Sequence, residues 1–145
     1  MLFEAAFWYP DQPRPGVEEG LARPDLAHLL ADWGRPGDTA VIAYDGATDL
    51  GAAWFRSWSD EEHSYGYVAA TIPELAIGVV GAHRRRGVGR ALLRALRQRA
   101  VQQDIRALSL SVEEANPAVR LYLSEGYERV STVENSWTMV LHIAP

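Results

Sequence analysis

A glycine-containing turn with several basic residues is the first feature of this sequence that suggests chemistry. The segment Arg84–Gly89 reads Arg-Arg-Arg-Gly-Val-Gly and joins an apolar run, Glu74–Val80, to a helical run that begins at Arg90. Backbone N–H groups at the start of a helix converge on one point, where the helix dipole also favours negative charge. Arginines near that point add charge and hydrogen-bond donors. We therefore expect this turn to bind a phosphorylated ligand.

Two familiar phosphate-binding motifs do not fit this turn. The Walker A pattern is absent and the chain has no lysine to complete it, and of the Rossmann fingerprint only Gly87-x-Gly89 is present. Two other interpretations remain: an ordinary strand-to-helix loop with surface arginines, or a basic helix that contacts nucleic acid. The acidic overall charge and the lack of aromatic residues among the arginines argue against nucleic acid.

A second group of residues lies in the segment Asn116–Tyr127, which reads Asn-Pro-Ala-Val-Arg-Leu-Tyr-Leu-Ser-Glu-Gly-Tyr. Asparagine as N-cap, proline at the first helical position and glycine after the last turn predict a short helix from Asn116 to Glu125. Taken alone, the segment predicts only a capped helix with Leu121 facing the core and Tyr122 half-buried.

Charge and composition narrow the class of protein. The chain has 145 residues, a net charge of −5, and 14 basic residues that are all arginine. Seven of these arginines fall between positions 84 and 99 with no acidic residue among them, which indicates a local anionic ligand. The absence of cysteine excludes disulfides and thiolate chemistry. We expect one cytoplasmic domain over residues 1–145, with no membrane span and no signal peptide.

Hydrophobic periodicity predicts a mixed α/β sheet with helices packed on it, in the order α-α-β-β-β-β-α-β-α-β-β. The expected helices span 2–9, 24–33, 87–102 and 116–125, and the expected strands span 39–44, 50–58, 65–69, 74–80, 107–112, 127–133 and 137–143. The third helix should face the core with Val88, Ala91, Leu92, Ala95 and Leu96. Gly78 within the central strand predicts a bulge or a splay that opens a gap for a ligand.

The two groups of residues, in this order and separation, resemble the GNAT superfamily of N-acetyltransferases. Arg84-x-x-Gly87-x-Gly89 is similar to that family's acyl-CoA signature [Q/R]xxGx[G/A], and Asn116 followed by Leu121-Tyr122 and Gly126-Tyr127 is similar to a later family motif. The strand Leu108–Val112 lies between them, as it does in the family. The resemblance covers roughly Thr39–Val140.

The resemblance implies acetyl-CoA as co-substrate and no metal. The pyrophosphate would lie on the amides of the turn, and the pantetheine arm would pair with the strand before it. Asn116 would contact that arm or only cap its helix. The implied cofactor-binding residues are Ile77, Val79, Arg84, Arg85, Arg86, Gly87, Val88, Gly89, Arg90 and Asn116.

The same resemblance implies transfer of an acetyl group to a primary amine by direct attack. Tyr122 matches the general acid, a backbone N–H near Val79 would be the oxyanion donor, and Glu74 is where several members place the general base. That base would act directly or through a water. Glu74 can equally be an exposed strand start, and Glu113 or Glu114 are alternatives. The four histidines show no metal-ligand spacing.

The acceptor is an amine-bearing small molecule or a peptide N-terminus, and the sequence does not identify it. The segments that the family uses for acceptor recognition are rich in aromatic and acidic residues: Phe3, Glu4, Phe7, Trp8, Tyr9, Trp33, Trp54, Trp58, Asp60, Glu61, Glu62, Tyr65 and Tyr67. The family's first strand has no counterpart before Leu2, so either this edge strand is missing or the true start lies upstream. A partner subunit that covers the exposed neighbouring strand would give a homodimer. The alternative function is an acyl-CoA-binding or regulatory domain without efficient catalysis.

Overall fold

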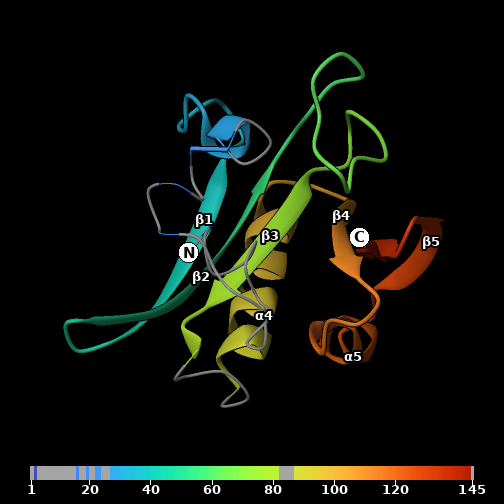
Figure 1. Ribbon diagram of the computed structural model, residues 1–145. Coiled ribbons are helices and arrows are strands. Elements are labelled where there is room, and N and C mark those ends of the chain that lie inside the picture. Colours follow the sequence, from blue (N-terminus) through green and yellow to red (C-terminus); the bar gives the residue numbers. More distant parts are fainter. Residues whose placement is uncertain are drawn as a thin grey trace.

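Six strands form one mixed sheet in the order β1-β2-β3-β4-β6-β5 (Figure 1). The computed structural model describes residues 2, 16, 19, 22–23, 27–81 and 87–144. Its elements are η1 (His28–Leu30), β1 (Thr39–Asp45), β2 (Thr48–Arg56), β3 (Glu74–Val79), α4 (Val88–Gln102), β4 (Ala107–Glu113), α5 (Ala118–Ser124), β5 (Glu128–Val133) and β6 (Ser136–His142). The expected α/β fold with a mixed sheet is confirmed.

The sheet consists of two antiparallel groups that meet at a weak parallel contact. Strands β1, β2 and β3 pair in sequence, and β4 pairs with β6, which pairs with β5. Between the groups, β3 and β4 share one register pair, Glu74 with Ser109, supported by the Ser109 amide donating to the Pro73 carbonyl at 3.0 Å. Beyond this pair the two strands separate, as Figure 1 shows.

The opening in the sheet lies between β3 and β4. The pairing of β2 with β3 continues without a shift through Gly78, which lies opposite Ala52. A splay is therefore present, and Gly78 does not form a bulge with β2. The contact between β3 and β4 is confined to the start of β3, near Glu74.

Helix α4 packs behind β1, β2 and β3 (Figure 1), and its buried residues are Leu92, Leu93, Leu96 and Ala100. The prediction that Ala91 and Ala95 face the core is wrong, because both residues are exposed. Leucine buries more apolar area than alanine, so the helix turns Leu93 inward and leaves the two alanines outside. The main core contains these leucines with Phe55, Leu75, Leu108, Leu110, Tyr122 and Met139 among others.

Two other expected elements differ from the structure. The predicted strand over 65–69 is wrong, because Tyr65 and Gly66 form a turn and 67–69 are irregular. Gly66 lies against the main chain of β4: a Cβ added there would be 2.6 Å from the Leu110 carbonyl carbon. The segment therefore crosses β4 and does not pair with a strand. Of the predicted helix over 24–33, the described part is the short η1, followed by a turn through Gly34.

The predicted helix over 2–9 lies outside the described residues, apart from Leu2. Strand β1 has an exposed outer edge in the described part of the chain, where it pairs only with β2. Its side chains Ile42 and Tyr44 are 60% and 71% exposed. Within the ranges that the structure describes, no helix is long and apolar enough to cross a membrane.

Candidate active site

The glycine turn stands at the start of α4, as predicted. Gly87 is the N-cap residue with φ of 82°, a left-handed conformation that suits glycine, and no side chain caps the helix there. The first hydrogen bond of the helix runs from the Ala91 amide to the Gly87 carbonyl. The amides of Val88, Gly89 and Arg90 therefore precede the regular helical bonding and can donate to an anion. Arg84, Arg85 and Arg86 lie outside the described residues.

The side chain of Arg90 makes contacts away from this turn. Its guanidinium Nη1 lies 3.1 Å from Ser124 Oγ and 3.3 Å from Glu125 Oε2. Arg94 on the next turn of α4 lies 2.7 Å from the other carboxylate oxygen of Glu125. These pairs link α4 to the C-terminal end of α5. Because the Arg90 side chain is engaged there, Arg90 contributes its backbone amide to the anion site at the glycine turn.

Three elements meet beside the glycine turn. A Cβ added to Gly89 would lie 3.1 Å from Leu121 Cδ2 of α5 and 3.9 Å from Ile77 Cδ1 of β3. Glycine at this position therefore lets α5 approach the first turn of α4 closely. The structure thus brings together the two groups of residues that the sequence singled out, around the side chain of Ile77.

The main-chain groups of Ile77 and Val79 face the opening in the sheet. The Val80 amide donates to the Leu50 carbonyl at 2.9 Å, so alternate residues of β3 hydrogen-bond to β2. By the same alternation, Ile77 and Val79 direct their main-chain groups toward the side from which β4 has separated. An extended ligand could pair with β3 there like an added strand.

Tyr122 is buried, with 6% of its surface exposed, and its ring meets the ring of Tyr127 edge-on at a centroid distance of 5.8 Å. Burial raises the pKa of the Tyr122 phenol well above its usual value. The side chain is consequently protonated at neutral pH and able to donate a proton or a hydrogen bond. It follows Leu121, which contacts the glycine turn.

Asn116 caps its helix. Its side-chain oxygen Oδ1 accepts a hydrogen bond from the Ala118 amide at 2.9 Å, and its backbone carbonyl accepts from Val119. The residue is half-buried. The capping role predicted from the sequence is therefore confirmed, and a contact with a ligand would have to use the amide nitrogen Nδ2.

Glu74 is held at the start of β3 by the loop that precedes it. Its Oε2 accepts a hydrogen bond from the Gly66 amide at 2.8 Å, while its Oε1 is buried without a hydrogen-bond partner. Desolvation raises the pKa of the Glu74 carboxyl, and hydrogen bonds from Gly66 and Ser64, with the nearby charges of His63 and His28, partly oppose it. A carboxylate with a raised pKa suits a general base.

The alternative bases are not near Glu74. Ser109 is the residue of β4 opposite Glu74, whereas Glu113 lies four residues farther along that strand. At about 3.3 Å per residue the separation along β4 is roughly 13 Å. Glu113 and Glu114 are also both exposed. The structure therefore places only Glu74 beside the narrow end of the opening.

Two features of this region were not predicted from the sequence. Ser109 is completely buried, and its hydroxyl has no hydrogen-bond partner. Its position in β4 between Leu108 and Leu110 gave no signal, because a serine that alternates with leucines is typical of the solvent face of a strand. The second feature is a buried ion pair between Arg56 and Asp38, whose side chains are 2% and 3% exposed.

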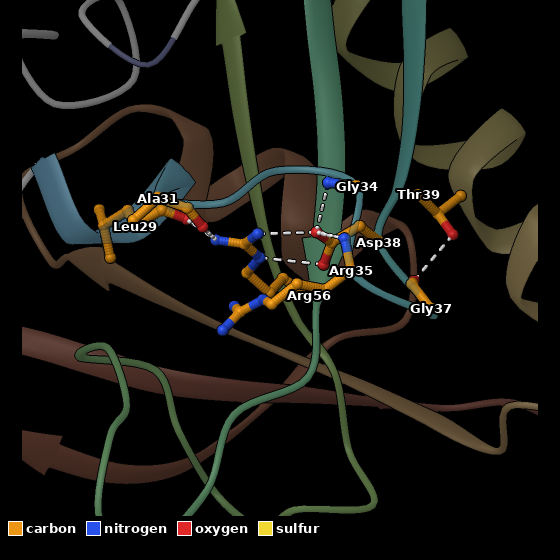
Figure 2. Close-up of polar contacts among 8 residues, drawn as sticks. All are labelled: Leu29, Ala31, Gly34, Arg35, Gly37, Asp38, Thr39 and Arg56. Carbon is orange, nitrogen blue, oxygen red and sulfur yellow. Dashed lines mark hydrogen bonds and ion pairs between the residues drawn. The ribbon is translucent and has the colours of Figure 1, made fainter.

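Figure 2 shows how this ion pair fixes the loop after η1. Arg56 donates to both carboxylate oxygens of Asp38, at 2.9 and 2.7 Å, and to the carbonyls of Leu29 and Ala31. Its guanidinium also lies over the ring of Trp58. The Arg56 guanidinium holds the pKa of the Asp38 carboxyl below its usual value. Because Arg56 is opposite Glu74 in the sheet, this loop is anchored beside the candidate base.

The described residues contain no group of three or more histidine, cysteine, aspartate or glutamate side chains that could hold a metal ion. Together the described residues offer backbone amides at one end, a strand edge along its length and a desolvated carboxylate at the other end. The protonated phenol of Tyr122 belongs to α5, the helix that approaches the first turn of α4.

Comparison with known proteins gives a family match for the sequence and solved structures with a similar fold. The sequence matches the acetyltransferase (GNAT) family over residues 4–127. No curated protein matches the sequence. The fold is similar to that of a GCN5-related N-acetyltransferase from Kribbella flavida, with a TM-score of 0.68 and 24% identity over 93% of this chain and 82% of that one.

Two other solved structures share the fold. The PaiA N-acetyltransferase from Thermoplasma acidophilum, solved with coenzyme A, has a TM-score of 0.72 and 15% identity over 98% of this chain and 88% of that one. The ribosomal-protein-S18-alanine N-acetyltransferase from Escherichia coli has a TM-score of 0.64 and 20% identity over 83% and 77%. Because the family match spans most of the sequence, this protein belongs to the GNAT acetyltransferase family.

Proposed function

We propose that this protein transfers an acetyl group from acetyl-CoA to a primary amine of a small molecule or a peptide N-terminus, by direct attack. The observation that carries the proposal is the splay between β3 and β4, which begins just beyond the register pair of Glu74 with Ser109. From Glu74 to Val79 the edge of β3 extends roughly 17 Å. It leads from a candidate base to the glycine turn at the start of α4.

The residues of the turn fit the phosphorylated half of acetyl-CoA. The amides of Val88, Gly89 and Arg90 would bind the pyrophosphate, with charge from Arg84–Arg86. Nothing of the described protein lies within 4 Å of the position that a Gly87 side chain would take, so the backbone is open to a ligand there. The main-chain groups of Ile77 and Val79 would pair with the pantetheine arm. The coenzyme A bound to the Thermoplasma acidophilum relative supports this choice of ligand.

Each proton in the reaction has a proposed partner. Glu74 would take one proton from the acceptor ammonium, directly or through a water. The free amine nitrogen would then form a bond to the thioester carbon, and a main-chain N–H near Val79 would stabilise the oxyanion. As the carbon–sulfur bond breaks, Tyr122 would donate its proton to the thiolate, or hydrogen-bond to it. The nitrogen would lose its second proton to water as the amide forms, and a Tyr122 that has donated would regain a proton from water. The raised pKa values of Glu74 and Tyr122 suit these roles.

Calorimetric titration with acetyl-CoA and an assay for released CoA thiol with a panel of amines test the proposal. We expect binding of acetyl-CoA and acetylation of at least one amine. Tyr122→Phe should lower kcat by about 100-fold, within the range of general acid catalysis, and leave cofactor affinity nearly intact. No binding of acetyl-CoA would refute the proposal. Binding without turnover of any amine would instead identify the protein as an acyl-CoA-binding domain.

A further inference from the structure

An arginine beside the acceptor end of the site has donors that the protein does not use. Arg35 lies in the loop between η1 and β1, and its side-chain Nη2 is buried without a hydrogen-bond partner. Arg35 as a whole residue is half-buried. A buried polar group without a partner is costly and calls for a specific explanation.

The carboxylate of Asp38, in the same loop, is already occupied by four hydrogen bonds. Asp38 Oδ1 accepts from Arg56 Nε, and its Oδ2 accepts from Arg56 Nη2 and from the backbone amides of Gly34 and Arg35. A carboxylate has about four acceptor positions, so none is left for the Arg35 side chain. In Figure 2 the dashed lines to guanidinium nitrogens all belong to Arg56. Asp38 is therefore paired with Arg56 and accepts from Arg35 through the backbone amide, so Arg35 Nη2 is left without a partner.

Contacts connect Arg35 to the candidate base. Its guanidinium carbon lies 5.4 Å from the centre of the Trp58 ring, and that ring lies 5.6 Å from the ring of His28. The guanidinium carbon of Arg56 lies 5.7 Å from the centre of the same Trp58 ring, and Arg56 is the residue of β2 opposite Glu74. Arg35 thus lies at the Glu74 end of the site, away from the glycine turn where the cofactor phosphates are expected.

An unused guanidinium held against an aromatic ring suits a planar anion. Arginine binds carboxylates through two parallel hydrogen bonds, and stacking on Trp58 orients its donors. The buried position of Nη2 lowers the competition from water, which strengthens a charged contact. A carboxylate on the acceptor would satisfy the donors that Asp38 cannot.

We propose that Arg35 binds a carboxylate of the acceptor, so that the preferred substrates are amines that also carry a carboxylate. This inference rests on the proposed acetyl transfer. The amine would lie at Glu74 and the carboxylate at Arg35. The acid can belong to a small amino acid or to an acidic side chain of a peptide, because the guanidinium recognises the same group in both.

Steady-state kinetics with matched acceptors test this inference. β-Alanine is compared with propylamine for small molecules, and Gly-Gly-Glu with Gly-Gly-Gln, both as C-terminal amides, for peptides. In each pair only the carboxylate differs appreciably. The enzymes are the wild type, Arg35→Gln, and Arg106→Gln as a control for an exposed arginine elsewhere. Whichever pair shows the larger preference identifies the source of the acid.

The wild type should favour the acidic member of at least one pair by about tenfold in kcat/KM, mainly through KM, as expected for a charged hydrogen bond. Arg35→Gln should remove that preference. Its kcat/KM for the neutral amine should stay within about twofold of the wild-type value, which excludes misfolding as the cause. The inference would be overturned if Arg35→Gln lost kcat/KM equally for both members of a pair, or if the wild type showed no preference. Acetylation of neutral amines would still support the proposed function in either case.

A binding measurement covers the case in which no amine is acetylated. Glutarate carries carboxylates but no amine, so its binding does not depend on the reaction. It should raise the melting temperature of the wild type and of Arg106→Gln but not of Arg35→Gln. An equal rise in all three proteins, or none in the wild type, would overturn the carboxylate site whatever the outcome of the acetylation assays.

Discussion

Replacement of Gly66 by alanine should disturb the candidate base through its loop. The added Cβ would lie 2.6 Å from the Leu110 carbonyl carbon, 2.7 Å from the Ser111 nitrogen and 2.8 Å from Glu74 Oε2. Comfortable contacts between heavy atoms are about 3.5 Å or more. Two of these neighbours belong to the main chain of β4, which cannot easily move. The loop must therefore shift by about 1 Å away from β4.

That shift should break the hydrogen bond from the Gly66 amide to Glu74, now 2.8 Å long. A hydrogen bond to a charged group contributes about 1.5–3 kcal/mol, which corresponds to about one to two pKa units. A shift of this size leaves too little space for water, so the desolvation of Glu74 should persist. Because the lost bond lowered the pKa of Glu74, that pKa should rise.

The pH dependence of kcat/KM measures this change. The reaction needs Glu74 without its proton, so activity falls as the pH drops through the pKa of this group. In Gly66→Ala the acidic limb should therefore move upward by about one unit, and the loss should be largest at low pH. Overpacking should also cost about 1–3 kcal/mol of stability, or roughly 5–10 °C in melting temperature for about 2 kcal/mol.

Gly16→Ala is the matched control, because a Cβ at Gly16 would meet nothing within 4 Å. Its melting temperature and pH profile should stay close to those of the wild type. If Gly66→Ala keeps the wild-type acidic limb despite a lower melting temperature, Glu74 is not the titrating base. A downward movement of that limb would instead show that solvent reaches Glu74 and outweighs the lost hydrogen bond.

Three further variants give distinct outcomes. Gly87→Val should weaken acetyl-CoA binding in calorimetry. It should also cost about 1–2 kcal/mol of stability, because the φ of Gly87 is positive. Unchanged affinity would show that the turn does not bind the cofactor. Asp38→Asn should destabilise the neutral-pH protein by about 3–5 kcal/mol by leaving Arg56 unpaired. Since the folded-state pKa of Asp38 is lowered, this difference should shrink on acidification through that pKa. Ser109→Ala should keep or raise the melting temperature, because the buried hydroxyl has no partner to lose; a large loss would contradict its lack of a partner.

Local patterns predicted most elements of the fold to within about two residues. Helix α5 illustrates the reason: Asn116 caps its start and Gly126 has a φ of 97° after its end, so residues next to the helix set its bounds. The nearly continuous apolar run of β3 likewise marks a strand covered on both faces. The strand expected over 65–69 failed, because contact of Gly66 with a distant strand decided its conformation.

The sequence by itself determined the glycine turn, the later Asn116–Tyr127 segment and, apart from the strand expected over 65–69, the succession of elements from β1 to β6 along the chain. All of these depend on neighbouring residues. Tertiary structure alone decided the state of Glu74, the burial of Ser109 and the pairing of Arg56 with Asp38. It also showed that Arg35 lies beside Trp58 with Asp38 already occupied. These properties arise from residues far apart in the chain, and desolvation and hydrogen-bond saturation depend on everything that surrounds a group in space.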